Sequence, residues 1–172
     1  IVLSHRLGAV RGFARYMTTI DPATQVPPAG VWPSTVPRPA PYVWSDTEIR
    51  ALLNAAGGLS DPLRAATYET LFGLLAACGM RIGEALGLAR TDVDLERGVI
   101  TINDAKFGRS RFVPMHPTTT DALGAYLTRR NRLCPRADTA SLFVSSRGSA
   151  LAYRSVHTTF IDLSTAIGVR TD

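Results

Sequence analysis

Apolar side chains recur every three or four positions along most of this chain, which is the spacing of one face of an α-helix. Ser45-Asp46-Thr47-Glu48 reads as a capping box, and Asp61-Pro62 supplies an N-cap followed by a proline in the first turn. Gly79 suits the left-handed position after a helix end. The pattern predicts helices over residues 3–18, 46–56, 62–78, 82–86, 118–133 and 153–167. The third of these is apolar nearly all round, so it is expected in the core.

Two other segments have the composition of strands. Residues 98–103 and 111–115 are rich in β-branched and aromatic side chains, and they flank Lys106-Phe107-Gly108-Arg109. This arrangement predicts a hairpin with Lys106 at its tip. Pro114 has no amide donor, which restricts the second strand to a sheet edge or to a strand end. The expected fold class is α+β, mainly helical, with a small antiparallel sheet; residues 141–144 add a short apolar segment.

Proline divides the chain. Residues 21–42 contain seven prolines, so they can form neither a helix nor a regular ladder and are expected to be a stiff, extended linker. Residues 1–20 then read as the end of another domain, and residues 43–172 as the main domain. The chain has no initial methionine and stops after Asp172 without a closing element, so it is expected to be a piece of a longer protein.

The basic residues are almost all of one type. Of 19 lysines and arginines, 18 are arginine, Lys106 is the single lysine, and the formal net charge is +5. A guanidinium stays protonated at any accessible pH, whereas a lysine can give up its proton when its surroundings lower its pKa. The arginine excess favours a polyanionic partner such as a nucleic acid over a small neutral substrate. A basic surface with no particular partner is the alternative.

Several classes of function have little support. Cys78 and Cys134 lie far apart without paired spacing, which indicates reduced thiols and no zinc site. Asp92 and Asp94 precede a strand with no other ligand nearby, so neither a metal ion nor another cofactor is expected. No apolar run is long enough to span a membrane, and the first residues carry arginines where a signal peptide is apolar. We therefore expect a cytoplasmic protein.

Arg81 and Glu84 are the first candidates for chemistry. They are three residues apart at the start of a predicted helix, so their side chains can meet on one face. The plain interpretation is a structural ion pair. The alternative is a partly desolvated guanidinium, held by Glu84, that presents its fork to two phosphate oxygens. If a phosphodiester were held there, the Lys106 ammonium could protonate its leaving oxygen.

Two ordered segments carry a more specific resemblance. Residues 79–88, Gly-Met-Arg-Ile-Gly-Glu-Ala-Leu-Gly-Leu, resemble the first conserved box of the tyrosine recombinases, the phage integrase family. Residues 105–114, Ala-Lys-Phe-Gly-Arg-Ser-Arg-Phe-Val-Pro, are similar to that family's lysine-bearing hairpin. The family implies a partial catalytic domain over residues 43–172, preceded at residues 1–20 by the last helix of a core-binding domain.

The resemblance implies a reaction and roles. Such enzymes cleave and rejoin double-stranded DNA through a 3′-phosphotyrosyl link and a free 5′-hydroxyl, without cofactor or metal. Carried over, Arg81 is the first catalytic arginine, Glu84 the acidic residue that supports the site, and Lys106 the general acid. Arg109 and Arg111 could contact phosphates, with charges on a solvated edge strand as the equal alternative. The family also implies self-association on DNA in the full-length protein.

Other parts of the family's site are missing from this sequence. No histidine is followed by arginine in an H-x-x-R box, and no tyrosine stands where the nucleophile belongs. Tyr153 opens a helix ahead of that region, so a core or capping role is expected for it. The chain alone is therefore expected not to cleave DNA.

Some interpretations remain open at this point. A second cluster of arginines is expected to form a solvated helix face, and it comprises Arg129, Arg130, Arg132 and Arg136. A non-catalytic DNA-binding or regulatory protein of the same fold would keep the basic surface without needing Arg81, Glu84 and Lys106 together. An unrelated helical domain would use Arg81 and Glu84 only as a structural pair.

Overall fold

The computed structural model of the 172-residue chain describes residues 2–30, 40–105, 109–137 and 139–169. The chain divides into two compact units, residues 1–43 and residues 44–172. Within the described residues, no helix is both long and apolar enough to cross a membrane.

Among its described residues, the first unit contains one helix, α1 (Val2–Met17), as the apolar spacing predicted. After it the chain turns, and Arg11 donates hydrogen bonds to the backbone oxygens of Pro27 (3.1 Å) and Pro28 (2.6 Å). Residues 21–30 form turns and irregular structure, while part of the predicted linker, residues 31–39, lies outside the described residues. The assignment of this unit to a core-binding domain and a linker stays a prediction.

The second unit starts with two helices that begin where the capping signals place them. In α2 (Asp46–Gly57), the Ser45 side chain and Glu48 form the predicted capping box. In α3 (Pro62–Cys78), the Asp61 carboxylate accepts hydrogen bonds from two amides of the first turn, and Gly79 ends the helix with φ of 59°. These local contacts satisfy helix-end groups that would otherwise lack partners.

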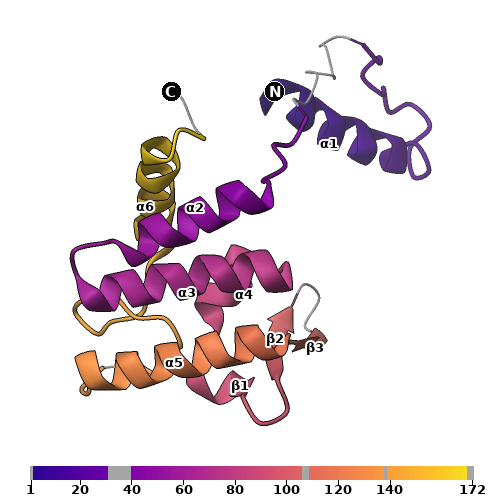
Figure 1. Cartoon of the computed structure of the whole chain (residues 1–172). Coiled ribbons are helices and arrows are strands. Elements are labelled where there is room, and N and C mark those ends of the chain that lie inside the picture. The colour runs from indigo at the N-terminus through magenta and orange to yellow at the C-terminus, as the bar shows by residue number, and fades with distance from the viewer. Residues whose placement is uncertain (1, 31–39, 106–108, 138, 170–172) are drawn as a thin grey trace. The chain divides into compact units, whose positions relative to one another are not determined.

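Helix α3 lies at the centre of this unit, as its uniformly apolar sequence predicted. It packs between α2 and α5 (Pro117–Leu133), while α6 (Tyr153–Ala166) contacts α2 and α4 (Ile82–Gly87) (Figure 1). Phe72 of α3 and Trp44 before α2 both contact Phe160 of α6, with ring centroids 5.8 and 5.5 Å apart. The fully buried Leu71 lies in the same core, so burial of α3 on several sides holds the helical layers together.

A three-stranded antiparallel sheet follows α4, in the order β1-β2-β3. The strands are β1 (Val93–Asp94), β2 (Val99–Ala105) and β3 (Arg109–Pro114), and a short 3₁₀ turn, η1 (Arg90–Asp92), precedes them. The hairpin prediction is confirmed, with longer strands than expected and with Pro114 at a strand end. The β2–β3 register shifts between Ile102 and Ala105, and the short β1 was not predicted.

The apolar segment 141–144 is not a strand of this sheet. It forms an isolated bridge between Ala89 and Ser141, and a second bridge joins Val144 to Ala150. Leu142 and Val144 are nevertheless fully buried. The segment is therefore part of the core as an extended loop, and several of its backbone oxygens accept hydrogen bonds from side chains, among them Tyr126 and Arg130, instead of from a strand.

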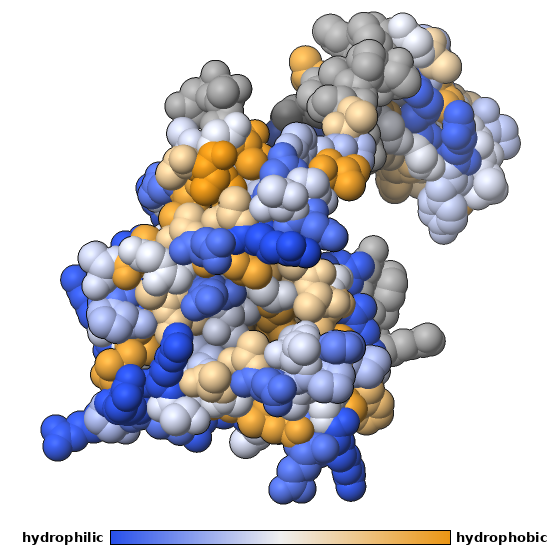
Figure 2. Space-filling model, viewed as in Figure 1, coloured by the Kyte–Doolittle hydropathy of each residue, from blue (hydrophilic) through white to orange (hydrophobic). Residues whose placement is uncertain are grey.

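Two expectations about single residues are wrong. Arg130 is not part of a solvated face: it is 2% exposed, and its Nη2 donates to the Ser141 backbone oxygen at 3.0 Å. On α5 it follows Leu123 and Tyr126 on the inward face, so the helical period buries it. The other three arginines of the cluster are exposed, and Figure 2 shows hydrophilic side chains projecting on the side where α5 ends.

Tyr153 has neither a core nor a capping role. It is 58% exposed, and its ring stacks on His157 one turn later, with centroids 6.0 Å apart. The N-cap of α6 is Ala152, which makes no side-chain cap. As the first residue of the helix, Tyr153 precedes the buried face that starts at Val156, so its side chain remains in solvent.

Candidate functional site

Glu84 is the centre of the polar cluster at the start of α4. Gly79 ends α3 in a left-handed conformation, and the next residue, Met80, is buried. Arg81 follows as the N-cap of α4. The Glu84 carboxylate accepts a hydrogen bond from the Arg81 backbone amide at 2.7 Å and another from Arg81 Nη1 at 3.0 Å. The sequence spacing correctly predicted this pair, because residues three apart meet at a helix start.

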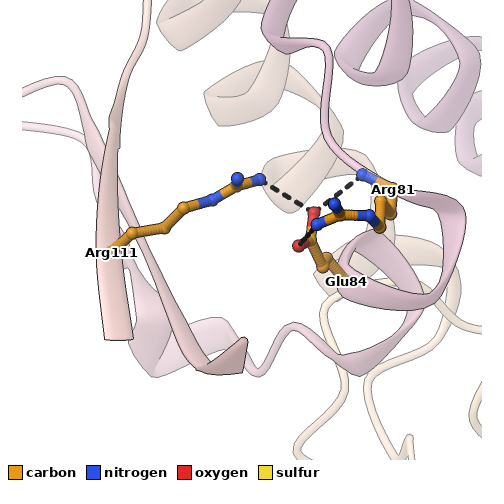
Figure 3. A network of polar contacts seen from close by, with 3 residues as sticks. All are labelled: Arg81, Glu84 and Arg111. Carbon is orange, nitrogen blue, oxygen red and sulfur yellow. Dashed lines mark hydrogen bonds and ion pairs between the residues drawn. The ribbon is translucent and has the colours of Figure 1, made fainter. Parts of the chain in front are cut away.

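A second arginine reaches the same carboxylate from the sheet. Arg111 of β3 donates from Nη2 to Glu84 Oε2 at 2.8 Å, so the carboxylate lies between two guanidinium groups (Figure 3). The Glu84 side chain is 11% exposed, whereas the Arg111 side chain is 44% exposed. One partly buried carboxylate thus joins α4 to the hairpin, a contact that neither sequence interpretation of Arg111 included.

Arg81 is more open than the sequence suggested. Its side chain is 68% exposed, so the expectation of partial desolvation is wrong. The N-cap position projects the side chain away from the core, and Met80 takes the buried position instead. Among the described residues, the Arg81 guanidinium donates to Glu84 alone. Its remaining N–H groups can therefore bind an anion from solvent.

The surroundings of Glu84 favour its charged form. The hydrogen bond from the Arg81 backbone amide lowers the pKa of Glu84, with smaller contributions in the same direction from the Arg81 and Arg111 side chains, while burial opposes them. The carboxylate therefore stays ionised below the pH range in which an ordinary glutamate takes up a proton.

This pKa shift predicts a pH-dependent stability. A depressed pKa stabilises the fold above the ordinary value of 4.5, and that contribution is lost as pH falls through the folded-state pKa. We expect Glu84→Gln to lower the free energy of unfolding by about 1 kcal/mol at neutral pH, because an amide is uncharged and its NH2 group cannot accept the hydrogen bond that one carboxylate oxygen accepts now. Urea titrations at pH 7 and pH 3 should show this difference shrinking with acidity, and a constant difference would contradict the interpretation.

The hairpin contributes the other two predicted site residues. Strand β2 ends at Ala105, and its backbone pairs with Arg109 at the start of β3. Lys106 lies outside the described residues, and so does the side chain of Arg109. The catalytic role of Lys106 and the DNA contacts of Arg109 and Arg111 stay predictions.

A cationic groove at the other end of α3 was missed by the sequence reasoning. It encloses about 740 Å³ and is lined by Arg64, Arg147 and Arg154, together with hydroxyl side chains such as Ser145 and Thr158. None of the described residues that line it is acidic. The groove joins α3, the loop before α6 and α6 itself, so no single sequence segment signals it.

The acidic residues near the sheet have structural partners. Asp92 accepts hydrogen bonds from the Ala89 amide at 2.8 Å and from Asn103 at 2.9 Å, and Asp94 pairs with Arg97. Within the described ranges, no three histidine, cysteine, aspartate or glutamate side chains come together as metal ligands would.

Comparisons with known proteins identify one family. The family model described as the phage integrase family matches residues 43–172. The y4rB protein of Sinorhizobium fredii, named as an integrase/recombinase, is 46% identical over 96% of this chain and 54% of its own length. Tyrosine recombinase XerD of Mycobacterium tuberculosis is 32% identical over 94% of this chain and 53% of its own.

Solved structures agree with the sequence comparisons. The crystal structure of XerA recombinase has a TM-score of 0.65 and 29% identity, covering 79% of this chain and 47% of that one. A lambda integrase dimer bound to a core site has a TM-score of 0.64 at 18% identity, covering 96% and 58%, which shows a shared fold.

The chain belongs to the phage integrase family, and its fold is that of the tyrosine recombinase catalytic domain. Family membership excludes the unrelated helical domain as an interpretation. The chain spans about half the length of the curated relatives it matches.

Proposed function

We propose that this chain is part of a site-specific tyrosine recombinase that cleaves and rejoins double-stranded DNA. The observation that carries the proposal is the Glu84 carboxylate shared by Arg81 and Arg111. It fixes a largely exposed guanidinium beside a hairpin strand, which is the arrangement a bound phosphodiester requires. Electrostatic groups held in place before the reaction stabilise developing charge without reorganising.

In the proposed reaction, a tyrosine oxygen attacks the scissile phosphorus and the bond to the 5′-oxygen breaks. Arg81 stabilises the negative charge on the non-bridging phosphate oxygens, and Glu84 orients Arg81. Lys106 gives its proton to the departing 5′-oxygen, which leaves as a hydroxyl. The product is a 3′-phosphotyrosyl link, and the reverse sequence with a partner strand rejoins the DNA.

This chain alone is proposed to bind DNA without cleaving it. Its sequence holds no H-x-x-R box, and Tyr153, at the start of α6, precedes the region where the family's nucleophile belongs. Assembly of several copies on DNA is proposed for the full-length protein. A regulatory protein of the same fold would bind DNA equally well, but it would tolerate replacement of Arg81 and Glu84.

The groove formed with Arg64, Arg147 and Arg154 is proposed as a second DNA contact. Arg64 donates to Thr159 at 2.8 Å, and its guanidinium lies 5.5 Å from the centre of the Tyr68 ring. These contacts fix its direction while Arg147 and Arg154 stay exposed. Since α3 rises about 1.5 Å per residue, the groove lies roughly 20 Å along it from Arg81, which is the length of about six base pairs.

Duplex binding by charge-matched variants tests this proposal. Fluorescence anisotropy with the combined variant Arg147→Ala/Arg154→Ala should show about tenfold weaker binding, because two phosphate contacts are lost. The control Arg50→Ala/Arg97→Ala removes the same charge from exposed positions on α2 and after β1, and should change affinity much less. Equal effects of the two pairs would mean that net charge alone attracts DNA and that the groove is not a contact.

A further inference from the structure

Three polar side chains link the β2–β3 hairpin to the turn that precedes the sheet. Asp92 of η1 accepts a hydrogen bond from Asn103 Nδ2 of β2 at 2.9 Å, and Asn103 Oδ1 accepts one from Ser110 Oγ of β3 at 3.3 Å. The other Asp92 oxygen accepts from the Ala89 amide at 2.8 Å. We call Asp92, Asn103 and Ser110 the hairpin relay.

The relay lies where the strand pairing changes. Ile102 pairs with Arg111, and the register shifts before the next pair, Ala105 with Arg109. Irregularities of this kind redirect side chains and weaken the backbone ladder locally. Asn103 and Ser110 stand at this shift, so their side-chain contact supplements a ladder that is interrupted there.

The relay also borders the candidate site. A cavity of about 190 Å³ between α4 and β2 is lined by Glu84 together with Asp92 and Asn103. Ser110 and Arg111 are consecutive in β3: Ser110 is tied through Asn103 to η1, and Arg111 is tied directly to Glu84. Two adjacent residues of one strand are therefore anchored to two different elements.

We propose that Asp92, Asn103 and Ser110 are positioning residues that hold the β2–β3 hairpin in the register that keeps Arg111 on Glu84. The amide of Asn103 uses both of its ends, donating to Asp92 and accepting from Ser110, so the relay has a fixed direction. The consequence for DNA binding rests on the proposed function. If this chain binds DNA there, the relay places the hairpin in the orientation in which Lys106 and Arg111 lie against the duplex.

An exchange of side chains tests the relay. Asn103→Asp alone sets two carboxylates against each other and breaks the contact with Asp92. Asp92→Asn alone keeps the contacts once the Asn103 amide turns over, because the Ser110 hydroxyl can accept as well as donate. In the combined variant Asp92→Asn/Asn103→Asp, the amide at position 92 accepts from Ala89 and donates to position 103, whose carboxylate still accepts from Ser110. All three hydrogen bonds are thereby restored at unchanged net charge. Asn131→Asp, at an exposed position on α5, is the charge-matched control outside the relay.

Hydrogen exchange of the backbone amides tests the relay in the absence of DNA. The variant Asn103→Asp should exchange the β2–β3 amides about fivefold faster, the factor for one hydrogen bond of ordinary strength, with α3 amides unchanged. The combined variant should return to within about twofold of the original chain. Unchanged hairpin exchange in Asn103→Asp, or no recovery in the combined variant, would overturn the relay whatever the chain does with DNA.

The effect of the relay on DNA binding can be measured at Lys106. It is the single lysine of the chain, so acylation followed by peptide mapping measures the accessibility of its amine alone. A bound duplex should protect Lys106 from acetic anhydride, and Asn103→Asp should lose about fivefold of this protection while the combined variant regains it. Altered exchange with full Lys106 protection would reduce the relay to a structural tie and overturn its positioning role. If DNA does not protect Lys106 in the original chain, the proposed function is wrong at this residue, and the positioning of Arg111 is judged from hydrogen exchange.

Discussion

Raising the salt concentration from about 50 to about 200 mM is expected to weaken duplex binding by this chain roughly a hundredfold. Each arginine that neutralises a phosphate displaces a condensed counterion, and the logarithm of affinity then falls by about 0.9 per phosphate for each tenfold rise in salt. The four arginines of the two proposed contact surfaces outside the hairpin, Arg81, Arg64, Arg147 and Arg154, and a fourfold change in salt already give about two decades, and phosphate contacts from the hairpin add to this loss.

Anisotropy titrations at several salt concentrations, on two duplexes of unrelated sequence, measure this slope. We expect weak binding with similar slopes for both, because phosphate contacts carry no sequence information. The variant Arg147→Ala/Arg154→Ala should have a shallower slope by about two phosphates. Binding that persists unchanged at high salt would indicate an interface without phosphate neutralisation and would contradict the proposal.

The sequence predicted the local structure well, because local structure depends on nearby residues. Ser45 with Glu48 and Asp61 with Pro62 start the helices where expected, and Gly79 ends α3. The pairing of Arg81 with Glu84 has the same origin, since one turn of helix determines it. The apolar residues on nearly all sides of α3 likewise predicted its position in the core.

Features formed by two segments that are distant in the sequence could not be predicted from local patterns. The Arg111–Glu84 contact depends on how the hairpin lies against α4, and a pattern of charges gives no such orientation. Arg130 reads as solvated in a run of arginines, yet the backbone oxygen of Ser141 accepts its hydrogen bond within the core. The cationic groove also joins three segments. Tertiary packing decides each of these cases.

Replacing Lys106 by alanine in a recombinase that contains this segment, together with an H-x-x-R box and a tyrosine nucleophile, is expected to slow strand cleavage by about 10²- to 10⁴-fold. Lys106→Arg should be nearly as slow, although it keeps the positive charge, because a guanidinium does not release its proton at an accessible pH. Single-turnover cleavage of a labelled duplex measures both variants. Full cleavage activity of the Lys106→Arg variant would show that the side chain at position 106 supplies a positive charge and not a proton.

A substrate with sulfur in place of the bridging 5′-oxygen separates proton transfer from other defects. A thiolate leaves without being protonated, since thiols are far more acidic than alcohols, so the sulfur substrate should restore cleavage by Lys106→Ala and Lys106→Arg to near the original rate. Arg109→Ala is the control, because it removes a neighbouring hairpin cation whose proposed role is phosphate contact, and sulfur should not rescue it. Slow cleavage of the sulfur substrate by the Lys106 variants would remove the acid role and leave the hairpin with positioning alone.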